Sequence, residues 1–292
     1  MATAHDDQVQ RAETFLALHH GPEVLVLLNA WDVASARIFA ACGSRAIGTT
    51  SMGIAAVAGF PDVERIGRDA MLDAVGRIAR SVEIPVSADL ERGYGGGPDE
   101  VATTIERALD CGVVGVNIED GSGEAGAPVI EIEAMCERVG AARSAAATRG
   151  VPLVINARTD VYLSQAGAPG QRLAEAVRRG NAYRDAGADC VFVPGGLERE
   201  TVRELARELE APLNVVANPA LSIPVVPTVP ELQDLGVARL SVGSGALRTT
   251  LSLTQRIAEE VLKGGVYGIM AEELGRPDAA RAYRAAIGAP ET

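Results

Sequence analysis

Short runs of apolar, mostly β-branched residues alternate with longer amphipathic stretches along the whole chain. The apolar runs predict strands over residues 24–28, 45–49, 84–89, 113–118, 152–157, 190–193, 213–217 and 239–242. The stretches between them predict helices over residues 63–81, 99–111, 130–148, 172–186, 198–209 and 246–262. Several runs are apolar on both faces, as parallel strands are when helices cover one side and a packed interior fills the other. Strict alternation of about eight such strands with helices predicts a closed (β/α)8 barrel of the TIM type.

Glycines occupy the joints between the predicted helices and strands. Gly43, Gly112, Gly187 and Gly236 each stand where a helix ends, a position that favours a left-handed backbone. An open doubly wound sheet would use the same joints, but no G-x-G-x-x-G motif opens a helix after the first strand. Because no linker or shift in composition divides the chain, we predict one domain over residues 1–292. The barrel would span about residues 22–263, and residues 264–292 would add one or two helices.

Composition narrows the class of protein further. The chain is 47% hydrophobic but only 3% aromatic, so the core must be aliphatic. Its net charge is −12 and it has no basic run, which argues against a nucleic-acid partner. No apolar window is long enough to span a membrane, and the polar N-terminal residues do not form a secretion signal. Four widely spaced cysteines are expected to be reduced, mostly buried thiols of a cytoplasmic protein.

Two residue types are too scarce for several kinds of chemistry. Lys263 is the only lysine, and it falls late in the last barrel helix, which argues against Schiff-base chemistry. The only histidines are His5, His19 and His20, all before the first predicted strand. A histidine base or a histidine-rich zinc site is therefore not expected. Acid–base and metal chemistry falls to carboxylates, Arg, Tyr, Ser, Thr and water.

Acidic residues gather at the C-terminal ends of consecutive predicted strands, where the active sites of such barrels lie. Asp89 and Glu91 end the third strand, Glu119 ends the fourth, Arg158 ends the fifth, and Asp62 lies in the loop after the second. A single acid in such a place is commonly a helix cap or an ion-pair partner. Neighbouring strands are about 4.8 Å apart, however, so Asp89, Glu91 and Glu119 can converge. An all-oxygen set suits Mg²⁺, or Mn²⁺, and Arg158 could then hold a substrate carboxylate.

Five segments together resemble the isocitrate lyase and phosphoenolpyruvate mutase superfamily over roughly residues 29–248. They read Asn29-Ala30-Trp31-Asp32, Gly59-Phe60-Pro61-Asp62, Pro85-Val86-Ser87-Ala88-Asp89-Leu90-Glu91-Arg92-Gly93-Tyr94-Gly95, Ile118-Glu119-Asp120 and Ala157-Arg158-Thr159-Asp160. The resemblance implies a Mg²⁺-dependent enzyme that makes or uses the enolate of a small 2-oxo acid. It also implies a homo-oligomer, commonly a tetramer, in which the eighth helix is exchanged between subunits.

The resemblance also assigns roles to individual residues. Asp89, Glu91 and Glu119 match the metal-binding positions, although Glu91 stands where the family usually has a second Asp. The catalytic set is Arg158, Glu119 and Asp62, and the substrate contacts are Thr50, Ser51, Met52, Trp31, Arg158 and Asn218. In the family, backbone amides at the positions of residues 50–52 hold the oxo-acid carboxylate.

The loop after the fourth strand departs from the family pattern. The lyases that cleave isocitrate and 2-methylisocitrate carry a basic Cys-Gly-His motif there, and the phosphonate enzymes carry a Lys and an Asn. Residues 120–128 of this chain contain none of these groups in those positions. We therefore predict a carbon–carbon lyase of different substrate, whose proton donor could be Tyr94, Ser122, Glu124 or water. The alternatives are a phosphorus–carbon bond enzyme or a barrel that binds an oxo acid without turnover.

Overall fold

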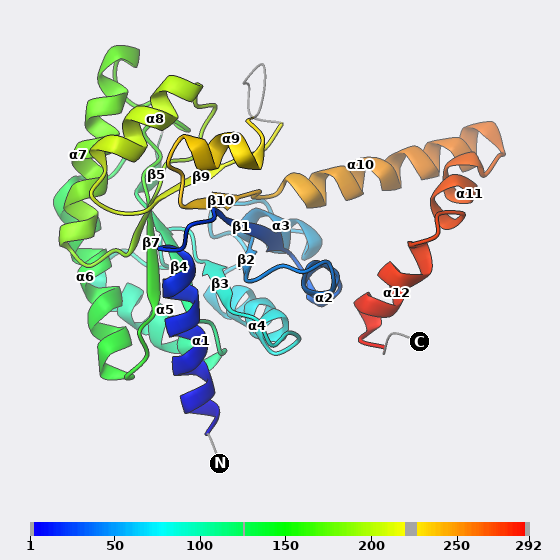
Figure 1. Cartoon of the computed structure of the whole chain (residues 1–292), viewed down its shortest axis with the longest axis horizontal. Helices are drawn as coiled ribbons and strands as arrows, with labels where there is room; N and C mark the ends of the chain where they lie inside the picture. The colour runs from blue at the N-terminus through cyan, green and yellow to red at the C-terminus, as the bar shows by residue number, and fades with distance from the viewer. Residues whose placement is uncertain (1–2, 125, 220–226, 290–292) are drawn as a thin grey trace.

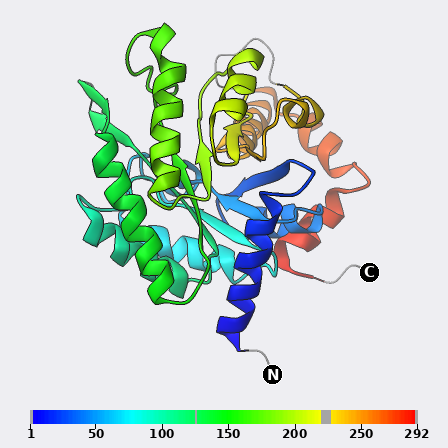
Figure 2. The same cartoon turned by 60° about the vertical axis from the view of Figure 1, so that its left-hand side comes forward.

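The computed structural model describes residues 3–124, 126–219 and 227–289. Eight parallel strands close into a barrel in the order β1-β10-β9-β8-β7-β4-β3-β2, so the predicted (β/α)8 fold is confirmed (Figures 1 and 2). The barrel strands are β1 Leu25–Ala30, β2 Ile47–Thr49, β3 Val86–Asp89, β4 Gly115–Glu119, β7 Val154–Arg158, β8 Cys190–Phe192, β9 Leu213–Val216 and β10 Arg239–Ser241. A two-stranded antiparallel hairpin, β5 Gly121–Glu124 and β6 Ala127–Val129, follows β4.

Helices surround the barrel, one or more after most strands. They are α1 Ala4–Leu18, α2 Val33–Ala41, α3 Ser51–Val57, α4 Arg68–Ala79, α5 Pro98–Asp110, α6 Ile132–Thr148, α7 Arg172–Asp185, α8 Arg199–Glu208, α9 Val229–Asp234 and α10 Gly245–Glu259. Short turns of 3₁₀-helix at Pro169–Gln171 and π-helix at Glu260–Gly264 precede α7 and follow α10. The glycines at the helix–strand joints take positive φ values, from 88° to 115°, as predicted for Gly43, Gly112, Gly187 and Gly236.

One predicted helix begins too early. Residues 63–67 precede α4 instead of forming its first turn, because Val63 and Glu64 have φ values of 68° and 58°. These left-handed residues turn the chain back towards the barrel mouth. The expectation of mostly buried thiols is also wrong, since only Cys190 is buried and Cys42 is exposed, although all four cysteines are free.

Polar side chains line the inside of the barrel near its C-terminal end. Ser87, Asn117, Asn156 and Ser241 are buried in β3, β4, β7 and β10, and all four border the same cavity. The residues that alternate with them in β4 and β7 are aliphatic and fully buried, because they face the surrounding helices. Two-residue periodicity thus gives these strands an apolar outer face and a polar inner face.

The N-terminal helix α1 closes the opposite end of the barrel. Phe15 is fully buried beneath Gly115, the first residue of β4, where a Cβ would come within 2.5 Å of the Phe15 ring. His19 donates through Nδ1 to the Phe15 carbonyl at 2.8 Å, and its Nε2 lies 3.5 Å from the guanidinium of Arg239. The helix therefore covers the N-terminal ends of strands on both sides of the barrel (Figure 1).

The C-terminal segment leaves the barrel and returns to it. Helix α10 runs outward, and α11 Gly268–Leu274 and α12 Ala279–Ile287 lead back to α2, where Arg37 donates to the Ala286 carbonyl (Figure 1). Two helices thus follow residue 264, within the predicted number. The assignment of the whole chain to one domain stays a prediction. Within the described residues, no helix has the length and apolar character that crossing a membrane requires.

Candidate active site

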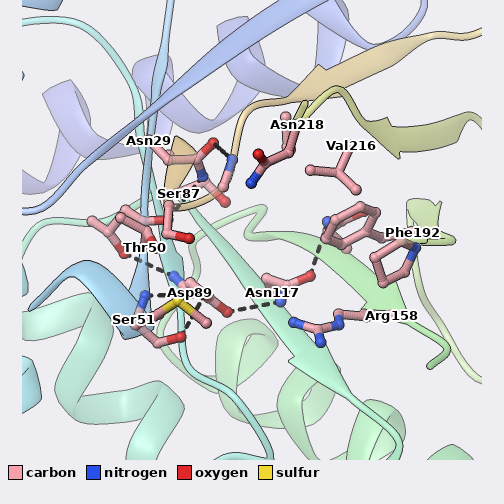
Figure 3. Close-up of a pocket in the computed structure, with 18 of the residues that line it drawn as sticks. Asn29, Thr50, Ser51, Ser87, Asp89, Asn117, Arg158, Phe192, Val216 and Asn218 are labelled. Atoms are coloured by element: carbon pink, nitrogen blue, oxygen red, sulfur yellow. Dashed lines mark hydrogen bonds between the residues drawn. The ribbon is translucent and has the colours of Figure 1, made fainter. Parts of the chain in front are cut away.

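A cavity of about 220 Å³ opens at the C-terminal end of the barrel (Figure 3). Seven of the predicted site residues line it, namely Thr50, Ser51, Met52, Asp62, Asp89, Arg158 and Asn218. Glu91 and Glu119 line an adjoining cavity that shares Ser51, Asp62 and Arg158 with the first. Trp31 is the exception, because it lines a separate cavity between α2, α3 and α4 and packs edge-on against Phe39.

Asp89 is fixed at the end of β3 by bonds to both of its carboxylate oxygens. Oδ2 accepts from the Ser51 amide at 3.1 Å and from its hydroxyl at 2.8 Å, and Oδ1 accepts from Asn117 Nδ2 at 2.9 Å. Asn117 in turn accepts from Asn156 Nδ2 at 3.0 Å (Figure 3). The parallel register pairs Asn117 with Asn156, which explains why the two amides meet. Neither amide was predicted to have a role, although each stands two residues before a predicted site residue.

Two of the backbone amides that were predicted to hold the oxo-acid carboxylate already donate to other groups of the protein. The Thr50 amide donates to the Ala30 carbonyl at 3.0 Å, and the Ser51 amide donates to Asp89. The Thr50 side chain caps α3 by accepting from the Gly53 amide. These contacts hold residues 50–52 against the cavity wall, with Met52 43% exposed at its edge.

Arg158 ends β7 in the centre of an acidic network. Its Nη1 lies 2.7 Å from Glu119, its Nε and Nη2 donate to Asp160 at 2.6 and 2.9 Å, and its guanidinium lies 5.9 Å from the Phe192 ring centre. Burial acts to lower the pKa of Arg158, but Glu119 and Asp160 outweigh it and raise that pKa. Arg158 is therefore a permanently charged group, with its side chain 17% exposed, that reaches both cavities.

Glu91 does not continue the extended strand, as the two-residue spacing from Asp89 had suggested. Its φ is 51°, and its carboxylate accepts from the Glu64 amide at 2.6 Å and from the Tyr94 hydroxyl at 3.0 Å. Glu64 accepts in turn from the Tyr94 amide at 2.6 Å and from Arg92 at 3.2 Å. The left-handed turn before α4 thus brings Glu64 into the site, where no sequence motif pointed to it.

Burial raises the pKa values of three acids at this site, and repulsion between them adds to the effect. Burial, with Asp89 and Asp62 adding repulsion, raises the pKa of Glu91 to about 7. Burial likewise raises the pKa of Asp62, whose Oδ1 is buried without a hydrogen-bond partner. Burial also raises the pKa of Glu119, against the opposing charge of Arg158. A divalent cation would remove this repulsion and engage the orphaned oxygen.

The residues fit a hard cation by their chemistry, although they are not arranged around one. Among the residues that the structure describes, no group of three His, Cys, Asp or Glu side chains is poised to hold a metal ion. The reason is visible in the contacts: Glu119 is paired with Arg158, and Glu91 faces Tyr94 and Glu64. The donors are all oxygen atoms, as Mg²⁺ and Mn²⁺ require.

The loop after β4 is ordered as the β5–β6 hairpin instead of an irregular gate. Ser122 donates to the Ala127 carbonyl across the hairpin, and Arg92 donates to the Ser122 carbonyl at 2.6 Å. Ala125 lies outside the described residues. The loop itself has no base, yet the loop after β3 supplies Arg92 to it, a contact that the sequence spacing did not predict.

Solved structures with the same fold include two enzymes that act on small acids. 2,3-Dimethylmalate lyase, a PEP mutase/isocitrate lyase superfamily member, gives a TM-score of 0.81 at 28% identity, covering 98% of this chain and 95% of that chain. Oxaloacetate acetylhydrolase, solved in complex with its product oxalate, gives 0.81 at 25% identity, covering 94% and 93%. The fold is that of this superfamily, as the resemblance implied.

The model of the phosphoenolpyruvate phosphomutase family matches residues 15–262, and the chain belongs to that family. Among its relatives, an uncharacterized protein of Mycobacterium tuberculosis is 35% identical over 86% of this chain and 90% of its own length. Oxaloacetate decarboxylase of Pseudomonas fluorescens is 30% identical over 82% of this chain and 81% of its own length. The relatives thus include enzymes with different reactions.

The metal-free protein is expected to lose stability as the pH rises from about 4.5 to about 7. In that window Glu91 keeps its proton in the folded chain, whereas a glutamate in the unfolded chain ionises near 4.5. In this window the folded state therefore binds more protons than the unfolded state. The protonated Glu91 contributes about 3 kcal/mol to the free energy of unfolding below the window, and this contribution is lost above it. Urea unfolding of the parent and Glu91→Gln across this pH range measures the effect. Parallel pH profiles for the two proteins would contradict it.

Proposed function

We propose that this protein is a Mg²⁺-dependent lyase that breaks or forms a carbon–carbon bond next to a small 2-oxo acid, through an enolate. The observation that carries the proposal is the placing of Arg158, charged and mostly buried, in one cavity with the fixed carboxylate of Asp89 and the unpartnered oxygen of Asp62. This arrangement suits a ligand with adjacent oxygen atoms that binds a cation on one side and a guanidinium on the other. The relatives named as lyase, acetylhydrolase and decarboxylase support the same class of reaction.

Each residue has a defined task in this reaction. Asp62, Asp89, Glu91 and Glu119 would hold Mg²⁺, which supplies positive charge for a developing oxyanion. Arg158 pairs with the substrate oxygens as negative charge grows on them, so its interaction is stronger in the transition state than in the ground state. The bonds from Ser51 and Asn117 keep the Asp89 carboxylate in one orientation before substrate arrives.

The proposal is tested by assaying oxaloacetate, substituted malates and 2-methylisocitrate with Mg²⁺, with release of a 2-oxo acid as the readout. Turnover of at least one of them, abolished by EDTA and restored by Mg²⁺, is the expected result. If none releases an oxo acid while oxalate still binds in the presence of Mg²⁺, the protein binds oxo acids without turnover. If no oxo acid binds either, the assignment of the site fails.

The second candidate function is cleavage or transfer at a phosphorus–carbon bond. The match to the phosphoenolpyruvate phosphomutase family and the contact between Arg92 and the hairpin favour it, since phosphoryl groups need cationic partners. Arg92 is also paired with Glu64 at 3.2 Å, however, which offsets its charge. Phosphorus NMR with phosphonopyruvate discriminates the two reactions, because only a phosphorus–carbon enzyme would change the phosphonate signal.

We further propose that the chain forms a homo-oligomer, most simply a tetramer, through the segment from α10 to α12. This segment leaves the barrel (Figure 1). It carries four exposed apolar side chains, Leu251, Leu262, Leu274 and Tyr283, whose exposed fractions are 50%, 85%, 76% and 69%. Apolar side chains exposed to this extent on one arm are typical of an interface. Light scattering after size exclusion should give a multiple of the 30.3 kDa chain, and Leu262→Glu should lower it. A monomeric parent would contradict the proposal.

A further inference from the structure

We propose that Asp120, together with Arg179 and Tyr183 of α7, is a positioning unit that sets the Arg158 guanidinium and ties it to the β5–β6 hairpin. The inference rests on the proposed function in one respect, that Arg158 contacts the oxo acid. None of the three residues lines the two site cavities, so they act through other groups. They are positioning residues and do not touch the substrate.

The carboxylate of Asp120 makes its hydrogen bonds to other buried groups of the protein. It is fully buried, and its Oδ2 accepts from the Tyr183 hydroxyl at 2.7 Å and from Arg179 Nη1 at 3.1 Å. Its Oδ1 accepts from the Asp160 amide at 2.8 Å. Tyr183 is also fully buried and Arg179 is 6% exposed, so these bonds do not compete with water. Both carboxylate oxygens are therefore fixed in direction.

Two connections lead from Asp120 to Arg158. The first passes through Asp160, whose backbone is held by Asp120 and whose carboxylate receives Arg158 Nε and Nη2 at 2.6 and 2.9 Å. The second is direct, because the Asp120 amide donates to the Arg158 carbonyl at 3.1 Å. A shift of the Asp120 carboxylate would move the segment carrying Asp160 and thus rotate the guanidinium fork.

The same unit holds the base of the hairpin. The Asp120 carbonyl accepts from the Ile130 amide at 2.8 Å, and Arg179 Nη1 donates to the Ile130 carbonyl at 2.8 Å. At the next residue along the chain, a Cβ on Gly121 would come within 2.8 Å of Asp160 Oδ2. Movement of the hairpin would therefore shift the Asp160 carboxylate, which accepts from Arg158. A side chain in place of Gly121 would displace that carboxylate directly.

If the unit only attached α7 to the barrel, its loss would lower stability without altering ligand binding. Another ion pair of the chain provides a matched control. Arg143 of α6 lies 2.5 Å from Asp189, which accepts from the Ile155 amide at 2.7 Å. This ion pair also joins a helix to strand backbone through an aspartate, but it sits near the start of β7, away from Arg158. Loss of either aspartate's charge should destabilise the fold, whereas only the Asp120 unit should alter ligand binding.

The experiment compares Tyr183→Phe and Asp120→Asn with Asp189→Asn. Calorimetric titration of oxalate in the presence of Mg²⁺ should show about tenfold weaker binding in the first two variants, the scale found for partners that orient a ligand-binding group. Asp189→Asn should bind oxalate as the parent does, even where its melting temperature falls. Parent-like affinity in Tyr183→Phe and Asp120→Asn, with lowered stability alone, would reduce the unit to a brace and overturn the proposal.

A second measurement separates this inference from the proposed function. If the parent binds no oxalate, the oxo-acid assignment has failed, and crystal structures of Tyr183→Phe and Gly121→Ala then decide the positioning role. Each variant changes one small group. In both, the Arg158 guanidinium should move and lose its two hydrogen bonds to the Asp160 carboxylate. If the guanidinium keeps its parent position in both, the unit does not position Arg158. Tyr183→Phe removes a single oxygen atom, so it also serves where Asp120→Asn fails to fold.

Discussion

Replacing Arg158 with lysine should lower kcat/KM by on the order of 100-fold or more, the scale of a lost transition-state donor. The guanidinium forms bonds to Glu119 and Asp160 through three of its nitrogens, and it faces the cavity from between them. A lysine ammonium is a single point of charge on a flexible stem, so it cannot keep both acids and also present a planar fork to the substrate. Because charge on the substrate oxygen grows as the enolate forms, the loss should fall mainly on kcat.

The control for this variant is Arg143→Lys. Arg143 also forms several bonds through its guanidinium, to the carbonyls of Leu153 and Gly187 and to Asp189, but it lies outside both site cavities. Steady-state kinetics and melting temperature should be measured on both variants. If Arg158→Lys resembles Arg143→Lys, with reduced stability and kcat/KM within a few-fold of the parent, then Arg158 serves only to hold Glu119 and Asp160.

Removing divalent metal should abolish tight oxalate binding and lower the melting temperature by several degrees. Without a cation, Asp62, Asp89 and Glu91 repel one another. Burial raises the pKa of Asp62 and of Glu91, and the charge of Asp89 raises both further. A cation that binds only the folded state adds about 2.7 kcal/mol at 100 times its dissociation constant. For a chain of this size, that corresponds to a rise of roughly 4 °C in melting temperature.

Thermal unfolding with Mg²⁺ and with EDTA provides the measurement, and Asp89→Asn provides the matched variant. The amide of Asn can still accept a hydrogen bond from Ser51, but it lacks the charge that attracts a cation. Its melting temperature should therefore respond little to Mg²⁺, whereas Asp189→Asn should respond as the parent does. An EDTA-treated parent with unchanged melting temperature and oxalate affinity would show that these carboxylates are not a metal site.

The sequence predicted the fold well because the barrel strands carry a strong and simple pattern. Each strand is aliphatic on its outer face, and the glycines at the joints can be recognised without any tertiary information. The β5–β6 hairpin was missed because residues 121–129 contain three glycines and a proline, which predict turns more strongly than strands. Helix α1 was missed because its polar face dominates, and only Ala12, Phe15 and Leu18 are buried in the barrel end.

The site was predicted as far as strand ends determine it. The rule that loops at the C-terminal end build the site brought Asp89, Glu119 and Arg158 together, and the structure places them in adjoining cavities. Glu64 was not found because its position depends on a left-handed turn, which leaves no periodic signal. The sequence also did not predict the direction of the Trp31 side chain. Trp31 adjoins a site segment in sequence, yet it lines another cavity.

The closure of one barrel end by α1 has a consequence for the order of events in a catalytic cycle. With Phe15 beneath Gly115 and His19 against Arg239, that end is filled by side chains. Within the described residues, the reactants and products of the proposed reaction would then pass through the C-terminal end of the barrel, where the two site cavities lie. In the proposed reaction, the product bound between Asp89 and Arg158 would then leave only after the product nearer the C-terminal end of the barrel has left. Turnover is therefore expected to release its two products in a fixed sequence, with the oxo acid last, and that oxo acid should compete with substrate for the empty enzyme.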